Sequence, residues 1–432
     1  MAFKPNFDFI EELEWRGLLH DQIPGSQDLL SKEMVSGYIG FDPTADSLHI
    51  GNMVPIMLLT LFQKAGHKPV VLIGGATGRV GDPSGKSAER QLLDNEAIQK
   101  NLDGQKAQLM RFLNFDSGEN KAVVVNNYDW FKDWSFLDFI RDVGKHITVS
   151  YMMSKDSVKN RLEAGGLSFT EFTYQLVQGY DFLHLYQNEN CKLQMGGSDQ
   201  WGNITTGTEL IRRKAQGEAF AVTAPLVTKA DGSKFGKSEG GNIWLDPNKT
   251  PVFTFYQFWL NIGDEDAVKF IKIYSLKSRE EIQALIDEHQ GQEYLRILQK
   301  ALAEEMTERV HGSQALELAQ KATQVFFGNG KEEDLRALDE ATLAASLEGM
   351  NTFQVSKMLV DNGIPVMDLI AGESSIFPSK GEARKMINGN GFSLNKTKCT
   401  DPELTVTSEY VLHNRYIIAQ KGKKNYFVIE LN

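Results

Sequence analysis

The sequence predicts an α/β fold built on a parallel sheet, followed by a helical segment and a small α+β module. Two observations support the parallel sheet. Short apolar runs such as Lys68–Ile73 alternate with helix-like segments, and uninterrupted apolar runs are typical of strands covered on both faces. Several runs also end in glycines and polar residues. Because open α/β sheets bind ligands at the carboxyl ends of their strands, these endings indicate a binding site.

Length and composition limit the class of protein. The chain has 432 residues, which is more than one hydrophobic core normally holds, so we expect two or three domains. Two cysteines, Cys191 and Cys399, argue against a disulfide framework and favour a reducing compartment. The N-terminus has no long apolar run after its lysine, and no stretch approaches the roughly 20 apolar residues of a membrane helix. We therefore expect a soluble, cytoplasmic protein.

The charge is distributed unevenly. The net charge of −11 argues against a surface that binds nucleic acid everywhere, but it allows a local basic patch. Residues 351–432 hold 10 Lys and Arg against 8 Asp and Glu, so the acidic excess lies in the rest of the chain. This difference indicates that the C-terminal segment is a separate module.

The stretch 35–62 predicts a strand, a turn and a helix. Val35–Phe41 is apolar and β-prone, Asp42-Pro-Thr44 has turn chemistry, and His49–Phe62 has an apolar helical face. Backbone N–H groups at a helix N-terminus attract anions, and Thr44 and His49 add side-chain donors. Gly51 lets a flat ligand approach the backbone. The alternative is an ordinary βα connection with a surface histidine.

A second candidate anion site follows the strand at Lys68–Ile73. The segment 74–86 contains five glycines before Lys86, and Arg90 follows at helix-like spacing. Glycines permit close backbone approach, and the two cations suit a phosphate. The segment lacks the spacing of a P-loop, so it is not a Walker site. A flexible surface loop with solvated charges is the alternative.

A polar face is predicted on the helix that begins at Ser168. Ser168 and Glu171 have capping-box spacing. Tyr174, Gln178 and Asp181 follow at i, i+4 and i+7, which places them on one face beside apolar neighbours. This arrangement suits a pocket wall, whereas the alternative is a solvated helix face.

Further strand ends carry polar residues. Strands are predicted at 121–127, 191–195 and 219–224. Asp199 follows the second of these and is suited to ribose hydroxyls, because a carboxylate accepts two hydrogen bonds. The loop 226–238 then carries three lysines and two glycines, which indicates a cationic loop or a solvated turn.

The remaining segments are predicted more coarsely. Residues 136–159 are expected to be helical, either facing a partner or packing within the chain. Residues 251–327 are predicted to be helical, with one long helix at 294–310, and the acidic, Ala-rich segment 329–350 a linker with some helix. The tail is predicted to contain a short helix at 353–362, a basic helix at 379–387 and hairpin strands. Five cations of this tail suit an RNA backbone: Lys380, Arg384, Lys385, Lys396 and Lys398.

Two short motifs, in order, identify a family. His49-Ile-Gly-Asn52 resembles the HIGH motif of class I aminoacyl-tRNA synthetases, and Lys234-Phe-Gly-Lys-Ser238 resembles their KMSKS motif. With the glycine-rich loop and Gly196-Gly-Ser-Asp-Gln-Trp-Gly202 between them, they resemble bacterial-type tyrosyl-tRNA synthetases over essentially the whole chain. The tail resembles the S4 RNA-binding domain. The resemblance implies a Rossmann-like catalytic domain at 1–225, a catalytic loop region at 226–250, a helical domain at 251–328, a linker at 329–350 and an S4-like domain at 351–432.

The resemblance also implies roles for matching residues. The substrate phenol hydroxyl is bound by Tyr38 and Asp181. The α-ammonium group is held by Asp82, Tyr174 and Gln178, with Gln200 close to the amino acid. The adenylate is contacted by Asp42, Gly51, Asn52, Gly197, Asp199 and Lys237. The phosphates are bound during catalysis by Thr44, His49, Lys86, Arg90, Lys234 and Lys237.

The implied substrates are L-tyrosine, ATP with Mg²⁺ and tRNA(Tyr). Magnesium is expected to be held mostly by phosphates and water, with no protein-bound metal. The family also implies a homodimer, with part of 130–160 as the interface, and no membrane association. No inserted editing domain is expected, because a buried phenol-binding pair rejects phenylalanine by itself; tyrosyl-tRNA synthetase is a standard example of this rejection.

Two departures from the motifs leave open questions. Asn52 stands where HIGH has its second histidine, and Phe235-Gly236 stand where KMSKS has Met-Ser. Two alternative functions also remain. A tryptophanyl-tRNA synthetase shares the class I core, although indole offers a single donor for Tyr38 and Asp181. A regulatory RNA-binding protein on an inactive core is disfavoured by His49 and both lysines of the second motif.

Overall fold

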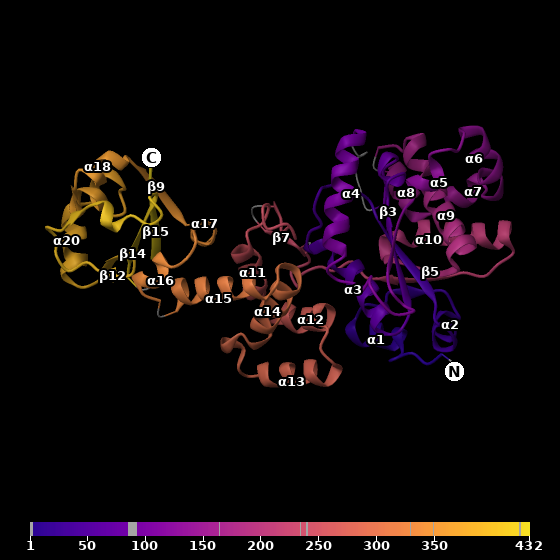
Figure 1. Ribbon diagram of the computed structural model, residues 1–432, viewed down its shortest axis with the longest axis horizontal. Helices are drawn as coiled ribbons and strands as arrows, with labels where there is room; N and C mark the ends of the chain where they lie inside the picture. Colours follow the sequence, from indigo (N-terminus) through magenta and orange to yellow (C-terminus); the bar gives the residue numbers. More distant parts are fainter. Residues whose placement is uncertain are drawn as a thin grey trace. The chain divides into compact units, whose positions relative to one another are not determined.

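The computed structural model describes residues 3–84, 93–163, 165–233, 235–238, 241–328, 330–348, 350–422 and 425–432. They form two compact units (Figure 1). The first comprises Met1–Lys249 and Trp259–Val310, and the second comprises Thr250–Phe258 and His311–Asn432. The five segments predicted from the sequence stay a prediction. No helix among the described residues is both long and apolar enough to cross a bilayer.

A six-stranded sheet is the centre of the first unit. Its spatial order is β1-β6-β5-β2-β3-β4, with β1 antiparallel to β6 and every other pair parallel. The predicted α/β fold with a parallel sheet is confirmed. The order reverses at β2, so the carboxyl ends of β2, β3 and β5 meet where such sheets bind ligands. The strands are β1 (Asp21–Gln22), β2 (Ser36–Phe41), β3 (Lys68–Ile73), β4 (Val123–Asn126), β5 (Cys191–Gly197) and β6 (Phe220–Ala224).

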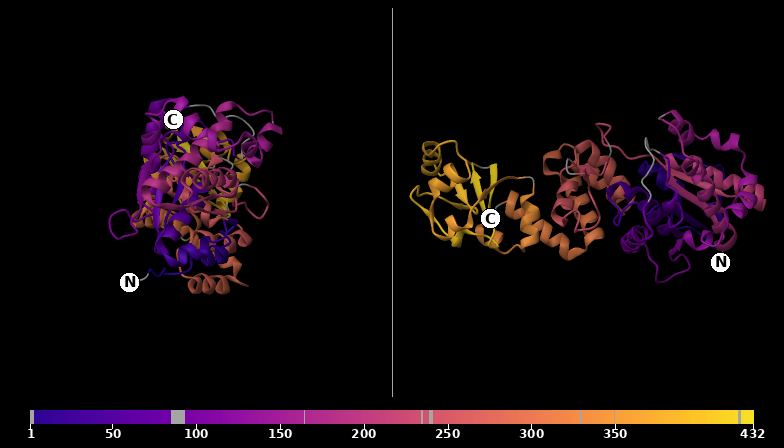
Figure 2. Two further views of the ribbon diagram at one scale, coloured as in Figure 1. Left: turned by 90° about the vertical axis from the view of Figure 1, so that its right-hand side faces the viewer. Right: turned by 90° about the horizontal axis from the view of Figure 1, so that it is seen from above.

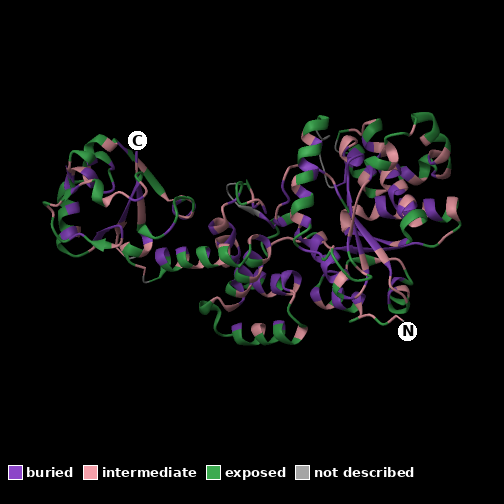
Figure 3. Cartoon of the chain, in the orientation of Figure 1, coloured by how far each residue is buried: buried purple, intermediate pink, exposed green. Residues whose placement is uncertain are grey.

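Helices cover the sheet on both faces. Gly37 of β2 faces α3, because a Cβ added to this glycine would lie 2.8 Å from the ring of Phe62 in α3. Its neighbour Tyr38 packs against Phe182 of α9, and successive residues of a strand point to opposite faces. Figure 3 shows the strands largely buried and the outer helix faces exposed. These helices are α1 (Phe9–Arg16), α2 (Ser26–Lys32), α3 (Met53–Lys64), α4 (Asn95–Leu109), α9 (Phe169–Glu189) and α10 (Trp201–Leu210).

Several predicted helices have different bounds. The predicted helix at 49–62 begins as a short 3₁₀ turn at Ile50–Asn52 and continues as α3. The helical run predicted at 136–159 is broken into α6 (Phe136–Asp142), α7 (Val149–Met153) and α8 (Asp156–Glu163). Ser135 and Thr148 cap α6 and α7 with their side chains, and such caps start new helices. A four-residue helix, α5 (Tyr128–Phe131), precedes them.

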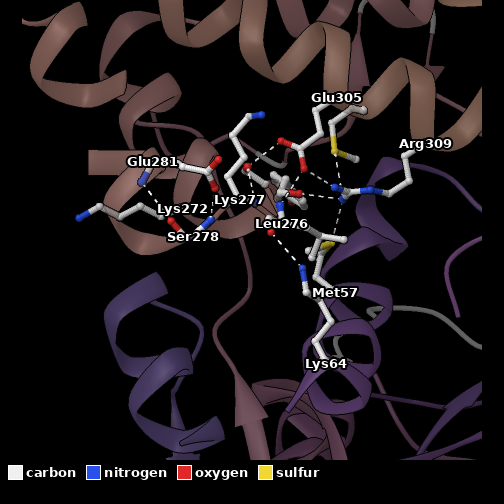
Figure 4. Close-up of polar contacts among 12 residues, drawn as sticks. Met57, Lys64, Lys272, Leu276, Lys277, Ser278, Glu281, Glu305 and Arg309 are labelled. Atoms are coloured by element: carbon white, nitrogen blue, oxygen red, sulfur yellow. Dashed lines mark hydrogen bonds and ion pairs between the residues drawn. The ribbon is translucent and has the colours of Figure 1, made fainter. Parts of the chain in front are cut away.

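Helices α12 (Asp264–Tyr274), α13 (Arg279–His289) and α14 (Ile297–His311) follow the sheet in the chain. The predicted helix at 294–310 starts three residues late, because Arg296 has a positive φ of 55°. Polar contacts hold the segment after α12 (Figure 4). Glu305 accepts hydrogen bonds from the Ser275 hydroxyl at 2.6 Å and the Leu276 N–H at 2.7 Å, and it pairs with Arg309. Lys64 of α3 donates to the Leu276 carbonyl at 3.0 Å.

The second unit is a small α+β module around a five-stranded sheet, which Figure 2 shows as yellow strands beside orange and yellow helices. Its order is β12-β11-β14-β15-β9, with only β15 and β9 parallel. The strands are β9 (Asn351–Val355), β11 (Phe392–Leu394), β12 (Thr397–Lys398), β14 (Tyr416–Lys421) and β15 (Asn425–Leu431); β10 (Ile364–Pro365) pairs with β13 (Thr405–Val406). The predicted hairpin is confirmed as β14–β15. The helix predicted at 353–362 is only partly correct, because its first residues belong to β9 and α18 covers Lys357–Asp361.

The acidic segment predicted to be a linker is packed into the second unit. It contains α16 (Glu332–Arg336) and α17 (Glu340–Leu347). Leu335 and Leu343 are fully buried in a core with Val325, Ile418 and Val428. Apolar residues spaced through a charged stretch form this buried face, so composition alone understates its packing. Among the described residues, four further α-helices belong to this unit or its boundary: α11 (Val252–Leu260), α15 (Ser313–Phe327), α19 (Val366–Asp368) and α20 (Lys380–Asn388).

Candidate active site

The first candidate group is the hydroxyl of Tyr38, the third residue of β2. The side chain is 1% exposed, and its ring packs edge-on against Phe182 with centroids 5.4 Å apart. Among the described residues, its Oη has no hydrogen-bond partner. Burial, together with the nearby carboxyl of Asp181, raises the pKa of this hydroxyl well above its usual value. A buried hydroxyl without a partner is costly, so this position suits a polar ligand group.

Asp181 lies on α9 beside Tyr38 and is 1% exposed. Its Oδ2 accepts a hydrogen bond from Asn127 Nδ2, and its Oδ1 accepts one from Trp130 Nε1, both at 3.0 Å. Burial raises the pKa of this carboxyl to about 8, while the two donors oppose the shift. The two donors also fix the orientation of the carboxyl. Tyr38 and Asp181, which the family resemblance assigns to one substrate group, therefore lie close together in the structure.

Asn127 and Trp130 were not predicted as site residues. Asn127 is completely buried, and it also donates to Thr77 Oγ1 at 3.1 Å and accepts from the Ala76 N–H at 2.6 Å. It therefore connects the end of β4 to the loop after β3. The sequence does contain a signal for Asn127: the predicted strand 121–127 ends in two asparagines, and the ends of parallel strands lie at one edge of the sheet.

The polar face of α9 also contacts the residue that follows β2. Tyr174 Oη donates to Asp42 Oδ2 at 2.9 Å. The family resemblance assigns these two residues to different substrate groups, whereas the structure places them in direct contact. Gln178 lies one turn further along α9 and is half-buried. Tyr174 and Asp181 are 5% and 1% exposed and Gln178 is half-buried, so this face of α9 is not a solvated one.

A second buried carboxylate, Asp82, lies in the loop after β3. It accepts hydrogen bonds from Gln200 Nε2 at 2.7 Å, from Asn203 Nδ2 at 3.4 Å and from the Ser84 N–H at 2.9 Å. Asn203 is 3% exposed and was not predicted as a site residue, because it stands inside α10. Asp82, which the resemblance assigns to the α-ammonium group, is therefore in contact with Gln200, which it places close to the amino acid.

The HIGH-like motif forms a tight turn before α3. Asn52 Oδ1 accepts a hydrogen bond from the His49 N–H at 3.0 Å. The His49 ring lies over Gly51, where a Cβ would come within 2.7 Å of it, and packs against Trp244 with centroids 5.6 Å apart. Asn52 thus caps the turn that carries His49, which is a structural role for the residue that departs from the motif. Thr44 lies in the preceding loop and is exposed.

The KFGKS segment lies against this turn. The Ile50 N–H donates to the Ile243 carbonyl at 2.9 Å, and the Ile243 N–H donates to the Gly236 carbonyl at 3.0 Å. Gly236 has a φ of +88°, and a Cβ there would lie 2.9 Å from the Gly51 nitrogen. Two short strands, β7 (Lys237–Ser238) and β8 (Gly241–Asn242), separate Gly236 from Ile243.

Phe235 anchors the same segment on its other side. Its ring is 6% exposed and packs against Phe270 at 4.1 Å, Trp259 at 5.6 Å and Tyr274 at 5.7 Å between centroids. Packing therefore explains why Phe235 and Gly236 stand where KMSKS has Met-Ser. The aromatic ring fills a pocket of α11 and α12 residues, and the glycine allows backbone contact with the HIGH-like turn.

Asp199 and Gly197 end the β5 side of the site. Gly197 is the last residue of β5, and Asp199 follows in a 3₁₀ turn at Ser198–Gln200. Asp199 lines a pocket of about 370 Å³ together with Lys155, Trp201 and Thr205. Lys155 Nζ donates to Thr205 Oγ1 at 3.0 Å, and burial lowers the pKa of this lysine to about 8.

Four predicted cations cannot be placed in this geometry. Lys86, Arg90 and Lys234 lie outside the described residues, as does the side chain of Lys237. Among the described residues, no group of three or more His, Cys, Asp or Glu side chains could hold a metal ion.

Comparison with known proteins assigns the family. The family of class I tRNA synthetases for tryptophan and tyrosine (tRNA-synt_1b) matches residues 30–328, and the Tyrosine–tRNA ligase SYY-like C-terminal domain matches residues 343–429. A Tyrosine–tRNA ligase of Porphyromonas gingivalis W83 is 58% identical over 98% of this chain and 99% of its own length. The chain belongs to the tyrosine–tRNA ligase family.

Other members of the tyrosine–tRNA ligase family are similar to this chain over most of its length. A Tyrosine–tRNA ligase of Bacteroides thetaiotaomicron is 56% identical over 98% of this chain and 99% of its own length. The solved structure of a C-terminally truncated mitochondrial tyrosyl-tRNA synthetase from Aspergillus nidulans is 32% identical, has a TM-score of 0.67, and covers 74% of this chain and 94% of its own. The function that follows is that of a tyrosine–tRNA ligase, an aminoacyl-tRNA synthetase, which removes the tryptophan alternative.

The C-terminal cations of this tyrosine–tRNA ligase differ in their surroundings. Lys385 and Lys398 are exposed. Lys380 pairs with Asp368, and Arg384 pairs with Glu403 at 2.8 Å. Lys396 donates to the Phe326 carbonyl at 2.9 Å and to the Tyr426 hydroxyl, so its ammonium group stabilises the unit itself.

Proposed function

We propose that Tyr38 and Asp181 select L-tyrosine by its phenol hydroxyl in the tyrosine–tRNA ligase reaction. The observation that carries this proposal is the buried Tyr38 hydroxyl, which has no partner among the described residues, beside a buried carboxyl held by two donors. A phenol hydroxyl both donates and accepts, so it satisfies both groups. A phenylalanine side chain leaves both unsatisfied.

The remaining polar groups hold the other parts of the substrate. The Asp82–Gln200 pair and Gln178 bind the α-ammonium group, since a buried carboxylate and amide oxygens suit a cation. Tyr174 orients Asp42 through their hydrogen bond. The adenylate lies along the carboxyl ends of β2 and β5, with Asp42, Gly51, Asn52, Gly197, Asp199 and Lys237 around it.

The first chemical step is an in-line displacement. The substrate carboxylate attacks the α-phosphate of ATP, the bond to the β-phosphate breaks, and pyrophosphate leaves with tyrosyl-adenylate formed. Negative charge grows on the leaving group, so catalysis needs donors and cations rather than a protein nucleophile. Thr44, His49, Lys86, Arg90, Lys234 and Lys237 supply them. Mg²⁺ enters with ATP and is held mostly by phosphate and water.

The second step joins tyrosine to the terminal adenosine of tRNA(Tyr), and the second unit contributes to tRNA binding. The exposed cations Lys385 and Lys398 support this assignment. Changing both to glutamate should raise the tRNA KM and reduce its salt dependence, while leaving tyrosine-dependent pyrophosphate exchange unchanged. An unchanged tRNA KM would remove this face from the tRNA site.

The protein acts as a homodimer in the cytoplasm. Three large apolar side chains of α6 support the interface: Phe136, Leu137 and Ile140 are 62%, 76% and 45% exposed. An exposed apolar patch of this kind is typical of an association surface. Sedimentation velocity of the Leu137→Asp variant should show monomers where the wild type shows dimers. Free, buried cysteines at 191 and 399 fit a reducing compartment.

A pyrophosphate-exchange screen across the amino acids tests the main assignment. Exchange should depend on tyrosine, with phenylalanine and tryptophan far less effective. Exchange driven better by tryptophan would contradict the assignment of Tyr38 and Asp181, and no exchange with any amino acid would favour an inactive, RNA-binding core.

A further inference from the structure

One face of α4 is polar although it is turned inward. Asn101, Gly104, Gln105 and Gln108 follow one another at i, i+3, i+4 and i+7, which places them on a single helix face. Asn101 is 8% exposed and Gln105 is 2% exposed. Burying an amide is costly unless it forms hydrogen bonds, so this face must have a polar partner.

That partner is the loop between β2 and the HIGH-like turn. Asn101 Nδ2 donates to the Pro43 carbonyl at 2.8 Å. Gln105 Nε2 donates to the Ala45 carbonyl at 3.0 Å and to the Asp42 carbonyl at 3.3 Å. Residues 42–48 belong to no helix or strand, so these side chains replace the partners that a regular element would provide.

Gln108 completes the set at the far end of the loop. Its Oε1 accepts from the Leu48 N–H at 2.7 Å, and its Nε2 donates to Ser47 Oγ at 2.9 Å. Ser47 Oγ also accepts from the Asp246 N–H at 3.2 Å. The Leu245 N–H donates to the Leu48 carbonyl at 2.8 Å. The same contacts therefore connect α4 to the segment that follows the KFGKS motif.

Gly104 shows how closely the helix and loop approach. A Cβ at this position would lie 2.0 Å from the Asp46 carbonyl oxygen, so no side chain fits between the two backbones. The Asp46 carboxylate forms ion pairs with Lys249 at 2.6 Å and with Lys100 at 3.1 Å. The loop is thus seated directly on α4.

We propose that Asn101, Gln105 and Gln108 are positioning residues for tyrosyl-adenylate formation. They hold residues 42–48 in the conformation that presents Thr44 and His49 to the phosphates of ATP. The inference rests on the proposed role of that loop. None of the three residues touches the reacting atoms. Their effect is on the placement of the loop, and small displacements of catalytic groups cost large factors in rate.

The test compares Gln105→Met with Gln99→Met. Gln99 lies on the exposed face of the same helix, so the control makes the same chemical change without touching the loop. Gln105→Met should lower the single-turnover rate of adenylate formation by roughly 10- to 100-fold. It should leave tyrosine affinity, measured by equilibrium dialysis, unchanged. Gln99→Met should match the wild type in both measurements.

A second pair of variants separates positioning from folding. Gln108→Glu keeps the oxygen that accepts from Leu48, whereas Gln108→Met loses it. The glutamate variant should therefore recover part of the rate lost in the methionine variant, and the Leu48 amide should exchange with deuterium faster only in the methionine variant. A merely structural residue would instead lower tyrosine affinity and rate together.

Two results would overturn the inference. One is equal adenylate rates for Gln105→Met and Gln99→Met, and the other is equal loss of rate and tyrosine affinity in Gln105→Met. Failure of the proposed function looks different, because the wild type itself would then form no tyrosyl-adenylate. In that case, hydrogen exchange of residues 44–48 without ligands still decides whether α4 holds the loop: equal exchange in Gln105→Met and Gln99→Met refutes it.

Discussion

Replacing Tyr38 with phenylalanine should stabilise the free protein and weaken its selectivity. The hydroxyl is buried and has no hydrogen-bond partner among the described residues, so removing it relieves part of a penalty of about 1–3 kcal/mol. The free energy of unfolding should therefore rise by up to about 1 kcal/mol. In the complex the same hydroxyl forms a hydrogen bond to the substrate phenol, worth about 0.5–1.5 kcal/mol. Losing it should lower the tyrosine-over-phenylalanine ratio of kcat/KM by roughly 2- to 13-fold.

The assays are urea unfolding without ligands and pyrophosphate exchange with each amino acid. Tyr151→Phe is a matched control, because Tyr151 Oη donates to the Thr205 carbonyl at 3.0 Å. Removing that bonded hydroxyl should destabilise the protein by about 1 kcal/mol and leave the selectivity ratio unchanged. If Tyr38→Phe destabilised the protein as Tyr151→Phe does, the Tyr38 hydroxyl would have a partner in the free protein. An unchanged ratio would remove Tyr38 from the substrate pocket.

Three further changes test other parts of the first unit. Gly236→Ala should slow adenylate formation about 10- to 100-fold, because its Cβ meets the HIGH-like turn; Gly232→Ala, with a similar φ of +80° and nothing within 4 Å, should not. Burial lowers the pKa of His67 to about 4. As pH falls from about 6.5 to about 4, this histidine is therefore protonated in the unfolded chain but stays neutral in the folded protein. This histidine should therefore remove about 3 kcal/mol of stability over that range, and unfolding of His67→Asn should depend correspondingly less on pH. Glu305→Gln should cost about 3 kcal/mol in urea unfolding, since it leaves the largely buried Arg309 without its counter-ion; no loss would show that the pair contributes little.

Local patterns predicted most of the catalytic fold. The strand Lys68–Ile73 was predicted with its observed bounds, because an uninterrupted apolar run bounded by glycines has few other interpretations. The helix start at Ser168 was predicted from its capping box, which the structure contains. The breaks within the helical stretch 136–159 were not predicted. Serine and threonine are common in loops as well as at helix starts, so Ser135 and Thr148 did not mark them as caps. The segment 329–350 was predicted to be a linker with some helix, because its charge obscures the few leucines that pack.

By itself, the sequence determined the succession of strands and helices, the strand ends that carry polar groups, and the resemblance that the family matches confirm. These follow from periodicity and spacing, which are local properties of the chain. Only the tertiary structure decided which side chains meet. Asn127 and Trp130 hold Asp181 from more than 50 positions away, and Gln105 of α4 reaches the loop after β2 across a sequence separation of 60. Such contacts depend on the order of strands in the sheet and on which helix face turns inward, and no local pattern contains that information.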